Sequence, residues 1–412
     1  MSEDQSASTI TDTQAAIAAQ AEVDAENHFH TAGVLTISAG HAVHDTFTGF
    51  LNPLLPTFIQ NLSMSTAQAG LLTVFMQWPS LFQPILGHIA DRVSLRPFFI
   101  MAPTVTAVAM SLLGVAPSYA VMAMMLLVAG ISSASIHAAG PAVIGHLSGK
   151  KLGRGMGWWM VGGELGRTLG PLTVVTAVQL IGLRGTPWLM IAGPITSVLL
   201  YYQLRNVSDI KRKDPEPIEW RSLTRSIGVF MLPLMLIIVV RDFINASLAT
   251  YLPILLSEQG SSLWLAGASL SVYQAAGVFG ALLGGTLSDR LGRRIILFVA
   301  MGVTSVAIFL FIYRADTIWL QLPLLLILGF FSLSITPVFM AMVQEHFPEN
   351  RALATGVYQS INFLIRSGIV VLLGVLADRH GMRVAFIISG LSSLLGLPLI
   401  LLLPKGVKKQ QA

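Results

Sequence analysis

Two histidines and an aspartate stand close together inside an apolar stretch of the sequence, in HAVHD at residues 41–45. On a helix, His41, His44, Asp45 and Thr48 are spaced at i, i+3, i+4 and i+7, so their side chains share one face. Histidine exchanges a proton near neutral pH, and a desolvated carboxyl group can do the same. The spacing predicts a proton-binding site in which Asp45 carries the proton and His41 and His44 assist it.

Five further charged residues interrupt apolar stretches, namely Glu164, Arg167, Arg241, Asp242 and Arg366. A charge facing lipid at the membrane centre costs roughly 2.5–3.5 kcal/mol, so these residues and Asp45 would together cost on the order of 15–20 kcal/mol. We therefore expect them to face one another or a wet cavity. The arginines suit an anionic or polar substrate. Glu164 and Asp242 would pair with them in the empty site, and Glu164 is also a candidate proton carrier. Fixed structural pairs between helices are the alternative interpretation.

Metal binding is another chemistry open to these residues. His41, His44, Asp45 and His137 carry donor atoms that divalent cations use, and they could converge. The three arginines argue against a cation at the same place. We therefore predict no metal site and no cofactor, and keep divalent metal transport as an alternative function.

Long apolar helices must position these residues. The chain has 412 residues, of which 54% are hydrophobic and 11% charged, and its mean hydropathy is +0.71. Soluble proteins carry about 25% charged residues, so the composition predicts an all-α protein that crosses a membrane many times. Apolar stretches that could each span a bilayer lie near residues 32–58, 66–88, 97–115, 119–147, 154–181, 186–204, 226–256, 264–287, 294–313, 318–345, 352–376 and 383–403.

The twelve predicted spans fall into two groups of six, separated by a charged, proline-containing segment. Lys and Arg concentrate in the loops on the side of the two chain ends, so the positive-inside rule places both termini and the linker in the cytoplasm. The expected divisions are an acidic tail at 1–30, a six-helix bundle at 31–204, a linker at 205–225, a second six-helix bundle at 226–404 and a basic tail at 405–412.

Several other classes of protein are excluded by the sequence. It has no cysteine, so no disulfide, thiolate metal site or thiol redox switch is encoded. It has neither the G-x-x-x-x-G-K-[ST] loop of ATP-driven motors nor the H-E-x-x-H motif of zinc proteases. The formal charge of +5 does not predict nucleic-acid binding, because the basic residues stand mostly at helix ends. We therefore predict a transporter rather than an enzyme.

Similar loops recur in the two halves. GHIADRVSLR at 87–96 aligns with GTLSDRLGRR at 285–294, and a degenerate copy, GVLADRHGMR at 374–383, follows the eleventh span on the other side. Similar turns on opposite faces indicate three-helix units repeated with inverted topology inside each half, which is an architecture of transporters.

These loops resemble the signature loop of the major facilitator superfamily, which joins helices 2 and 3 and again helices 8 and 9. The resemblance covers roughly residues 30–405 and implies two pseudo-symmetric six-helix bundles that work by alternating access. It also implies that the loops act as gates, through Asp91, Arg92, Asp289, Arg290, Arg293 and Arg294.

A second pattern stands in the fifth span. Gly157, Gly166, Gly170 and Pro171 match the G-x8-G-x3-G-P pattern of the superfamily's antiporters, although valines replace the two glycines that normally end it. Physically, small residues let helices approach closely. Within the superfamily the chain most resembles the fosmidomycin resistance group, through HAVHD, SSASIHAAGP at 132–141 and MVGGELGRTLGPL at 160–172.

The resemblance further implies that helices 1, 4, 7 and 10 line a central cavity bordered by helices 5 and 11. The expected substrate-binding residues are His137, Arg167, Arg241, Asp242, Tyr273, Gln274, Asn362 and Arg366. We predict a proton-coupled secondary transporter of the bacterial cytoplasmic (inner) membrane, working as a monomer, that exports a small polar or anionic compound or drug in exchange for protons. Import of a small organic anion by proton symport is the alternative.

Overall fold

The computed structural model describes residues 29–82, 96–205, 220–314, 317–347 and 351–403. These residues form α-helices with short 3-10 or π segments, and no strand occurs among them. The N-terminal half holds α2 (Thr31–Thr48), α3 (Leu51–Leu62), α4 (Thr66–Gln77), η1 (Trp78–Phe82), α6 (Arg96–Ser111), η2 (Leu112–Val115), α7 (Tyr119–Ser148), η3 (Gly149–Lys151), α8 (Leu152–Ile181), η4 (Leu183–Ile191) and α9 (Ala192–Leu204). The C-terminal half holds α10 (Trp220–Ala246), η5 (Ser247–Tyr251), α11 (Leu252–Glu258), α12 (Leu263–Leu291), α13 (Arg293–Arg314), α14 (Ile318–His346), α15 (Arg351–His380) and α16 (Met382–Ile400).

Helices lie at each position where the sequence predicts a span. Within the described ranges, eight helical stretches are long and apolar enough to cross a membrane by length and composition. The others are divided, short or more polar. α2 and α3 are separated at Gly49 and Phe50, and α4 with η1 stops at Phe82, where the described segment ends. η4 precedes a short α9, and α8 carries several glycines and three charged residues. The prediction of an all-α polytopic membrane protein is confirmed. α10 begins at Trp220, within the segment that the sequence assigns to the linker.

The first spans of the two halves carry prolines at equivalent positions, Pro56 and Pro253. Pro253 has no amide hydrogen to donate to the carbonyl oxygen of Ala249, and the chain passes through the π segment η5 just before it. The side-chain amide of Asn52, from the other half, donates to that carbonyl at 2.8 Å. Asn52 and Ala249 are 197 residues apart, the same offset that relates Pro56 to Pro253. Equivalent positions of the two halves therefore contact each other.

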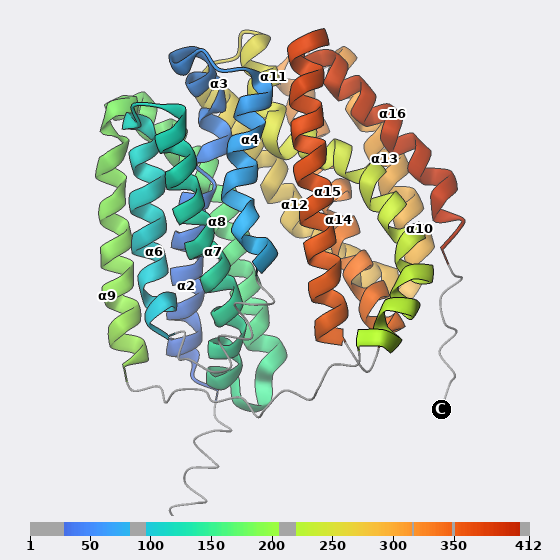
Figure 1. The fold of residues 1–412 in the computed structure, drawn as a ribbon, viewed down its shortest axis with the longest axis horizontal. Coiled ribbons are helices and arrows are strands. Elements are labelled where there is room, and N and C mark those ends of the chain that lie inside the picture. The colour runs from blue at the N-terminus through green and yellow to red at the C-terminus, as the bar shows by residue number, and fades with distance from the viewer. Residues whose placement is uncertain (1–28, 83–95, 206–219, 315–316, 348–350, 404–412) are drawn as a thin grey trace, which may run out of the picture.

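The helices form two bundles side by side, blue to green and yellow to red in Figure 1. We call the end where α9 stops and α10 starts the linker end, which lies at the bottom of Figure 1. At the opposite end a single apolar core spans both halves and includes Leu51 and Leu256. Toward the linker end the core divides: Val34 belongs to a core within the N-terminal half, and Leu234 to one within the C-terminal half.

Hydrogen bonds between the halves also lie toward the opposite end. α8 packs on α12, where the Leu172 amide donates to Ser271 Oγ at 3.1 Å. Trp264 Nε1, at the start of α12, donates to Thr176 Oγ1 at 3.1 Å. α4 of the N-terminal half also packs on α15 of the C-terminal half. The halves are therefore joined at the opposite end, while their cores are separate at the linker end.

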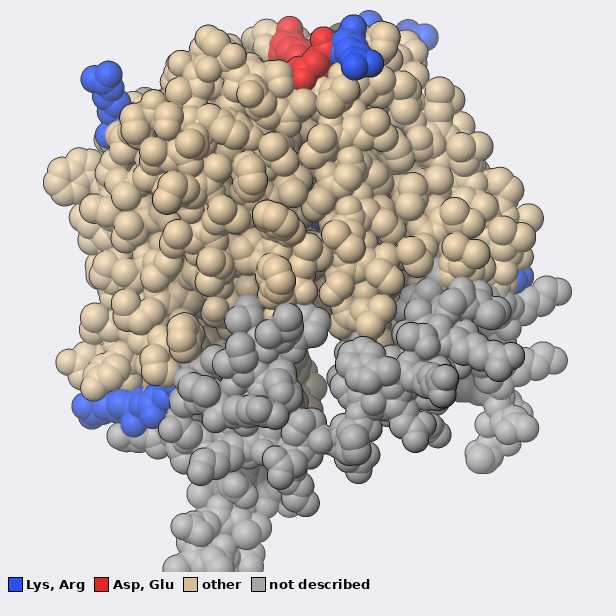
Figure 2. Space-filling model, viewed as in Figure 1, with Lys and Arg blue, Asp and Glu red and all other residues tan. Residues whose placement is uncertain are grey.

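The outer surface is suited to lipid. On the face drawn in Figure 2, the charged side chains of the described residues lie toward the two ends, and the belt between them carries none in colour. Large apolar side chains such as Leu180 and Leu282 are exposed on the molecule. An apolar belt between two charged rims fits a protein that crosses a bilayer.

Candidate functional site

Glycines of α8 bring this helix against the backbone of α2. A Cβ atom added at Gly162, Gly166 or Gly170 would meet a carbonyl oxygen of α2, from Ser38, Ala42 and Thr46 respectively. These contacts recur every four residues on both helices, so only hydrogen atoms fit between the two backbones. At Gly157 an added Cβ would meet nothing within 4 Å. Close packing therefore uses Gly166 and Gly170 of the predicted antiporter pattern, together with Gly162, which that pattern does not include.

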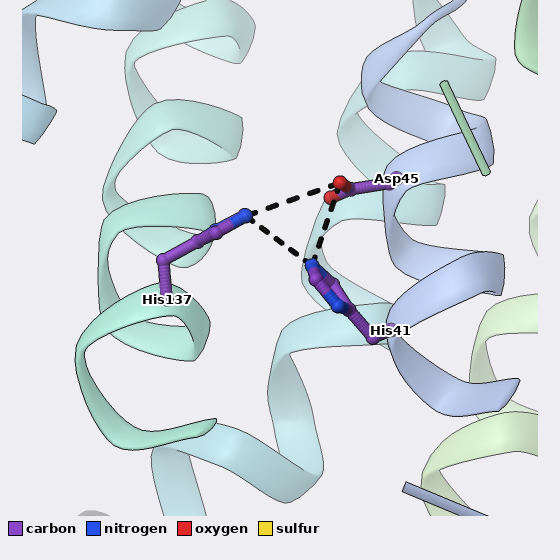
Figure 3. Close-up of side chains that lie close together, drawn as sticks. All are labelled: His41, Asp45 and His137. Atoms are coloured by element: carbon purple, nitrogen blue, oxygen red, sulfur yellow. Dashed lines mark hydrogen bonds and ion pairs between the residues drawn. The ribbon is translucent and has the colours of Figure 1, made fainter. Parts of the chain in front are cut away.

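The polar face of α2 meets α7 beside this contact. Figure 3 shows His41 and Asp45 from α2 and His137 from α7 pointing toward one another. His41 Nε2 lies 3.3 Å from His137 Nε2 and 3.4 Å from Asp45 Oδ2, and His137 Nε2 lies 3.9 Å from Asp45 Oδ2. We call these three residues the histidine cluster. The structure therefore brings together the two predicted proton-site residues His41 and Asp45 with the predicted substrate residue His137.

Main-chain carbonyls fix the orientation of both cluster imidazoles. His41 Nδ1 lies 3.0 Å from the Trp159 carbonyl oxygen, and the His41 ring stacks on the Trp159 ring at 3.7 Å between centroids. His137 Nδ1 lies 2.8 Å from the Ser133 carbonyl oxygen. A carbonyl only accepts hydrogen bonds, so each Nδ1 carries a hydrogen and donates it. Ser133 stands one turn before His137 on α7, whereas Trp159 lies on α8, so only the partner of His41 depends on how the helices are placed.

Asp45 has further partners on its other side. His44 Nδ1 lies 2.9 Å from Asp45 Oδ1, and both side chains are buried. Arg167 Nη1 lies 3.7 Å from Asp45 Oδ2, and Arg167 also pairs with Glu164 one turn earlier on α8. The side chain of Asp45 is only 3% exposed, whereas those of His137 and Arg167 are 30% and 42% exposed. The cluster is therefore reached from the side of His137 and Arg167.

The charged residues of the C-terminal half form a separate group. Arg241 Nη1 donates to Asp242 Oδ1 at 2.7 Å, and Arg241 Nη2 donates to Thr336 Oγ1 at 2.6 Å and to the Ser332 carbonyl at 3.2 Å. Arg241 is 5% exposed and Asp242 is fully buried, and the bonds of Arg241 join α10 to α14. Tyr273 is also fully buried, with its hydroxyl 2.9 Å from Ser332 Oγ. These contacts favour structural pairs, the interpretation that the sequence left as an alternative, and a role of Arg241, Asp242 and Tyr273 in substrate binding stays a prediction.

Arg366, Asn362 and Gln274 are half-buried in the same half. Arg366 Nε and Asn362 Oδ1 are buried atoms without a hydrogen-bond partner. The positive charges of Arg167 and Arg366 interact across the boundary between the halves. Of the predicted arginines, Arg167 and Arg366 are thus the two that remain accessible to a bound anion.

The second signature loop is held within its own half. Arg293 pairs with Asp289 at 2.5 Å and with Glu345, at the end of α14, at 2.6 Å. It also bonds Ser288, and Arg294 Nη2 donates to the Leu401 carbonyl at 3.2 Å. Asp289 and Arg290 are exposed. Glu345 was not identified from the sequence, and Asp91 and Arg92 of the first loop lie outside the described residues.

One set of side chains has the arrangement of metal ligands among the residues that the structure describes. One donor atom each from His41, Asp45 and His137 lies within 4.8 Å of the other two. His44, which the sequence grouped with them, is not part of this set. From the sequence, three converging arginines argued against a cation at this place. Among the described residues, Arg167 is the arginine that contacts Asp45, whereas Arg241 pairs with Asp242 in the other half, to which Arg366 also belongs.

Comparisons with known proteins agree with this architecture. The sequence model of the Major Facilitator Superfamily matches residues 37–369 and 270–412. The fosmidomycin resistance protein of Escherichia coli (strain K12) is 24% identical over 391 residues, which cover 93% of this chain and 95% of that protein. The multi-drug resistance efflux pump PmrA of Streptococcus pneumoniae is 25% identical over 281 residues, which cover 64% of this chain and 69% of the pump.

Solved structures share the fold. A bacterial homolog of the human lysosomal transporter Spinster, in an inward-facing and unoccupied conformation, superposes with a TM-score of 0.75 at 15% identity, covering 91% of this chain and 96% of that one. The nucleoside transporter NupG superposes with a TM-score of 0.71 at 14% identity, covering 90% of this chain and 98% of that one. These matches confirm the resemblance predicted from the signature loops and exclude an enzyme. The chain belongs to the Major Facilitator Superfamily and is a transporter.

Proposed function

We propose that this transporter exports a small polar or anionic compound or drug in exchange for protons. The observation that carries the proposal is the position of Asp45, a buried carboxylate on α2 that contacts His41, His44, His137 and Arg167. A buried ionisable group inside a membrane protein marks an ion or proton pathway. Export is supported by two relatives, a fosmidomycin resistance protein and a multi-drug resistance efflux pump.

The proton would be taken up by Asp45 with the help of His41 and His44. Glu164 would join the pathway through Arg167, which it contacts and which lies 3.7 Å from Asp45. Exchange requires that the proton and the substrate compete, so a hydrogen-bond donor of the substrate would contact the deprotonated Asp45 carboxylate while Arg167 holds its anionic group. Uptake of a proton by Asp45 would remove this acceptor charge and release the substrate.

The substrate would bind between the halves, on Arg167 and His137 from one side and on Arg366, Asn362 and Gln274 from the other. Arg366 and Asn362 each offer a buried polar atom that lacks a partner. Arg241, Asp242 and Tyr273 would act behind this surface by holding α10, α12 and α14 together, through the bonds to Ser332 and Thr336.

Alternating access would work by opening and closing the two ends. The linker end would be the open end in this state, which is supported by the separate apolar cores of the two halves there. The positive-inside rule places that end in the cytoplasm, so the state is inward-facing. The signature loops at this end, with Arg293 bound to Asp289 and Glu345, would close it in the outward-facing state. We place the protein in the bacterial inner membrane, as a monomer.

The proposal is tested by proton movement in proteoliposomes that contain a trapped pH dye. A panel of phosphonates, carboxylates, drugs and divalent metals is added to wild type, Asp45→Asn and Glu258→Gln, a carboxylate variant at the exposed end of α11. We expect a substrate that raises the luminal pH in wild type and in Glu258→Gln but not in Asp45→Asn. A fall in luminal pH would instead indicate symport, and unchanged proton movement in Asp45→Asn would refute the role of Asp45.

A further inference from the structure

Three hydrogen-bond acceptors converge in the histidine cluster. Because His41 Nδ1 and His137 Nδ1 both donate to backbone carbonyls, neither ring needs a hydrogen on Nε2 to be neutral. When both rings are neutral, both Nε2 atoms present lone pairs, and they face each other at 3.3 Å. The third atom, Asp45 Oδ2, is an acceptor as well. Three lone pairs at one point repel one another unless a proton or a metal ion lies between them.

The distances in the cluster suit a metal ion that joins all three atoms. Hydrogen bonds between nitrogen and oxygen atoms span about 2.7–3.2 Å, and the two nitrogen–oxygen distances, at 3.4 and 3.9 Å, are longer, whereas the two Nε2 atoms lie within hydrogen-bond reach of each other at 3.3 Å. A tetrahedral Zn²⁺ ion with bonds of 2.0–2.2 Å holds its ligand atoms roughly 3.3–3.6 Å apart. Two of the three distances fit this range, and the third needs only a small rotation of His137, which is partly exposed. One proton joins two acceptors, whereas one metal ion joins all three.

The surroundings also have the form of a metal site. Metal-binding histidines almost always donate their other ring hydrogen to a carbonyl or carboxylate, which fixes the ring and its tautomer. His41 does so with Trp159, and His137 with Ser133. The second oxygen of Asp45 is held by His44 at 2.9 Å. Gly163 faces the cluster, where an added Cβ would lie 2.5 Å from His41 Cε1, so this side has no room for a side chain.

The local charge favours a cation. Asp45 and Glu164 carry two negative charges and Arg167 carries one positive charge, so the three sum to −1 when the histidines are neutral. Glu164 pairs with Arg167 and neutralises part of its positive charge near the cluster. The sequence alone could not separate Arg167 from the arginines of the other half, and for that reason it predicted no metal.

We propose that His41 Nε2, Asp45 Oδ2 and His137 Nε2 bind one divalent transition-metal ion of the Zn²⁺ type. The fourth coordination position is open toward the exposed side chains of His137 and Arg167, where water or an anionic oxygen of a substrate completes it. Three protein ligands with an open fourth position is the arrangement of zinc sites that act on a bound group. A metal ion and a proton would compete for Asp45, so uptake of a proton by Asp45 would weaken metal binding. Metal binding itself needs no transport cycle, so it is measured separately from export.

The test is Co²⁺ binding to the purified full chain, carrying no polyhistidine tag and freed of metal with a chelator. Tetrahedral Co²⁺ gives a visible absorption band, which reports geometry as well as occupancy. We expect one Co²⁺ per chain with a tetrahedral spectrum, displaced by Zn²⁺. His137→Gln should bind about tenfold more weakly or worse, since even loss of a supporting partner costs 10–100-fold. His380→Gln, an exposed histidine in the other half, is the matched control and should bind as wild type does.

Asp45→Asn is a second variant, and the melting temperature of each variant shows whether it remains folded. A folded His137→Gln protein that binds Co²⁺ as tightly as wild type overturns the site, as does an octahedral spectrum or the absence of stoichiometric binding. Proton-coupled export by a protein that binds no Co²⁺ would leave the proposed function intact and reject the metal site alone.

Discussion

The carboxylate of Asp378, near the end of α15, accepts a hydrogen bond of 2.7 Å from the backbone amide of Thr66, the first residue of α4. Its other oxygen accepts from the Ala67 amide at 3.0 Å. One half of the protein thus caps a helix of the other half, at the end where the halves are joined. Asp378 belongs to the degenerate copy of the signature loop at 374–383. At the linker end the corresponding Asp289 pairs with Arg293 of its own half instead.

Removal of this cap should loosen the closed end. Loss of an N-cap side chain costs about 0.5–2 kcal/mol, so Asp378→Ala should shift the equilibrium between the two facing states roughly 2–30-fold toward the state open at this end. The chain has no cysteine, so Gln60→Cys with Gln259→Cys gives one clean pair of spin labels, with one label on each half. The measurement is the population of long distances between the labels.

Arg379→Ala is the control for this change, because Arg379 is the exposed neighbour of Asp378 on the same helix end. Its distance distribution should match that of the unsubstituted labelled chain. Equal distributions for Asp378→Ala and Arg379→Ala would show that the cap does not hold the end closed.

Two glycines of the antiporter pattern should respond differently to the same substitution. In Gly166→Ala the new methyl group would meet the Ala42 carbonyl oxygen and lie 2.8 Å from Asp45 Cβ. Overpacking of this kind costs about 1–3 kcal/mol. Gly157→Ala adds its methyl group where nothing lies within 4 Å, and alanine favours a helix over glycine by up to about 1 kcal/mol. Thermal unfolding in detergent should therefore show a lower melting temperature for Gly166→Ala only. A similar decrease in both would mean that the pattern acts by something other than this helix contact.

The Arg241–Asp242 pair should be required for folding but not for transport. Asp242→Asn leaves a buried guanidinium without its counter-charge, and breaking a buried pair in this way costs about 3–5 kcal/mol. Arg241→Met combined with Asp242→Asn removes both charges and should recover most of that loss, as judged by melting temperature and yield of monodisperse protein. Substrate flux by the double variant then distinguishes a structural pair from a substrate-binding Arg241. Flux close to wild type supports a structural pair, and a folded but inactive double variant would assign Arg241 to the substrate.

The sequence by itself determined the local properties of this protein. The lengths of the apolar stretches set the positions of the helices, because a helix satisfies its own backbone hydrogen bonds and needs only apolar side chains to enter a bilayer. The i, i+3, i+4 spacing placed His41, His44 and Asp45 on one face. The signature loops indicated the superfamily, since they are short continuous motifs.

The tertiary structure decided which of these residues meet. The sequence treated the six mid-membrane charges as one group, whereas the structure pairs Arg241 with its neighbour Asp242 and separates both from Asp45. It decided that His137, 96 residues from His41, completes the cluster, and that Gly162 rather than Gly157 packs against α2. It also decided at which end the two halves share one apolar core. The physical reason is that such contacts depend on the rotation and depth of each helix relative to its neighbours. Rotation and depth are set by packing between helices that are distant in the chain, whereas the spacing of residues along one helix sets only which of them share a face.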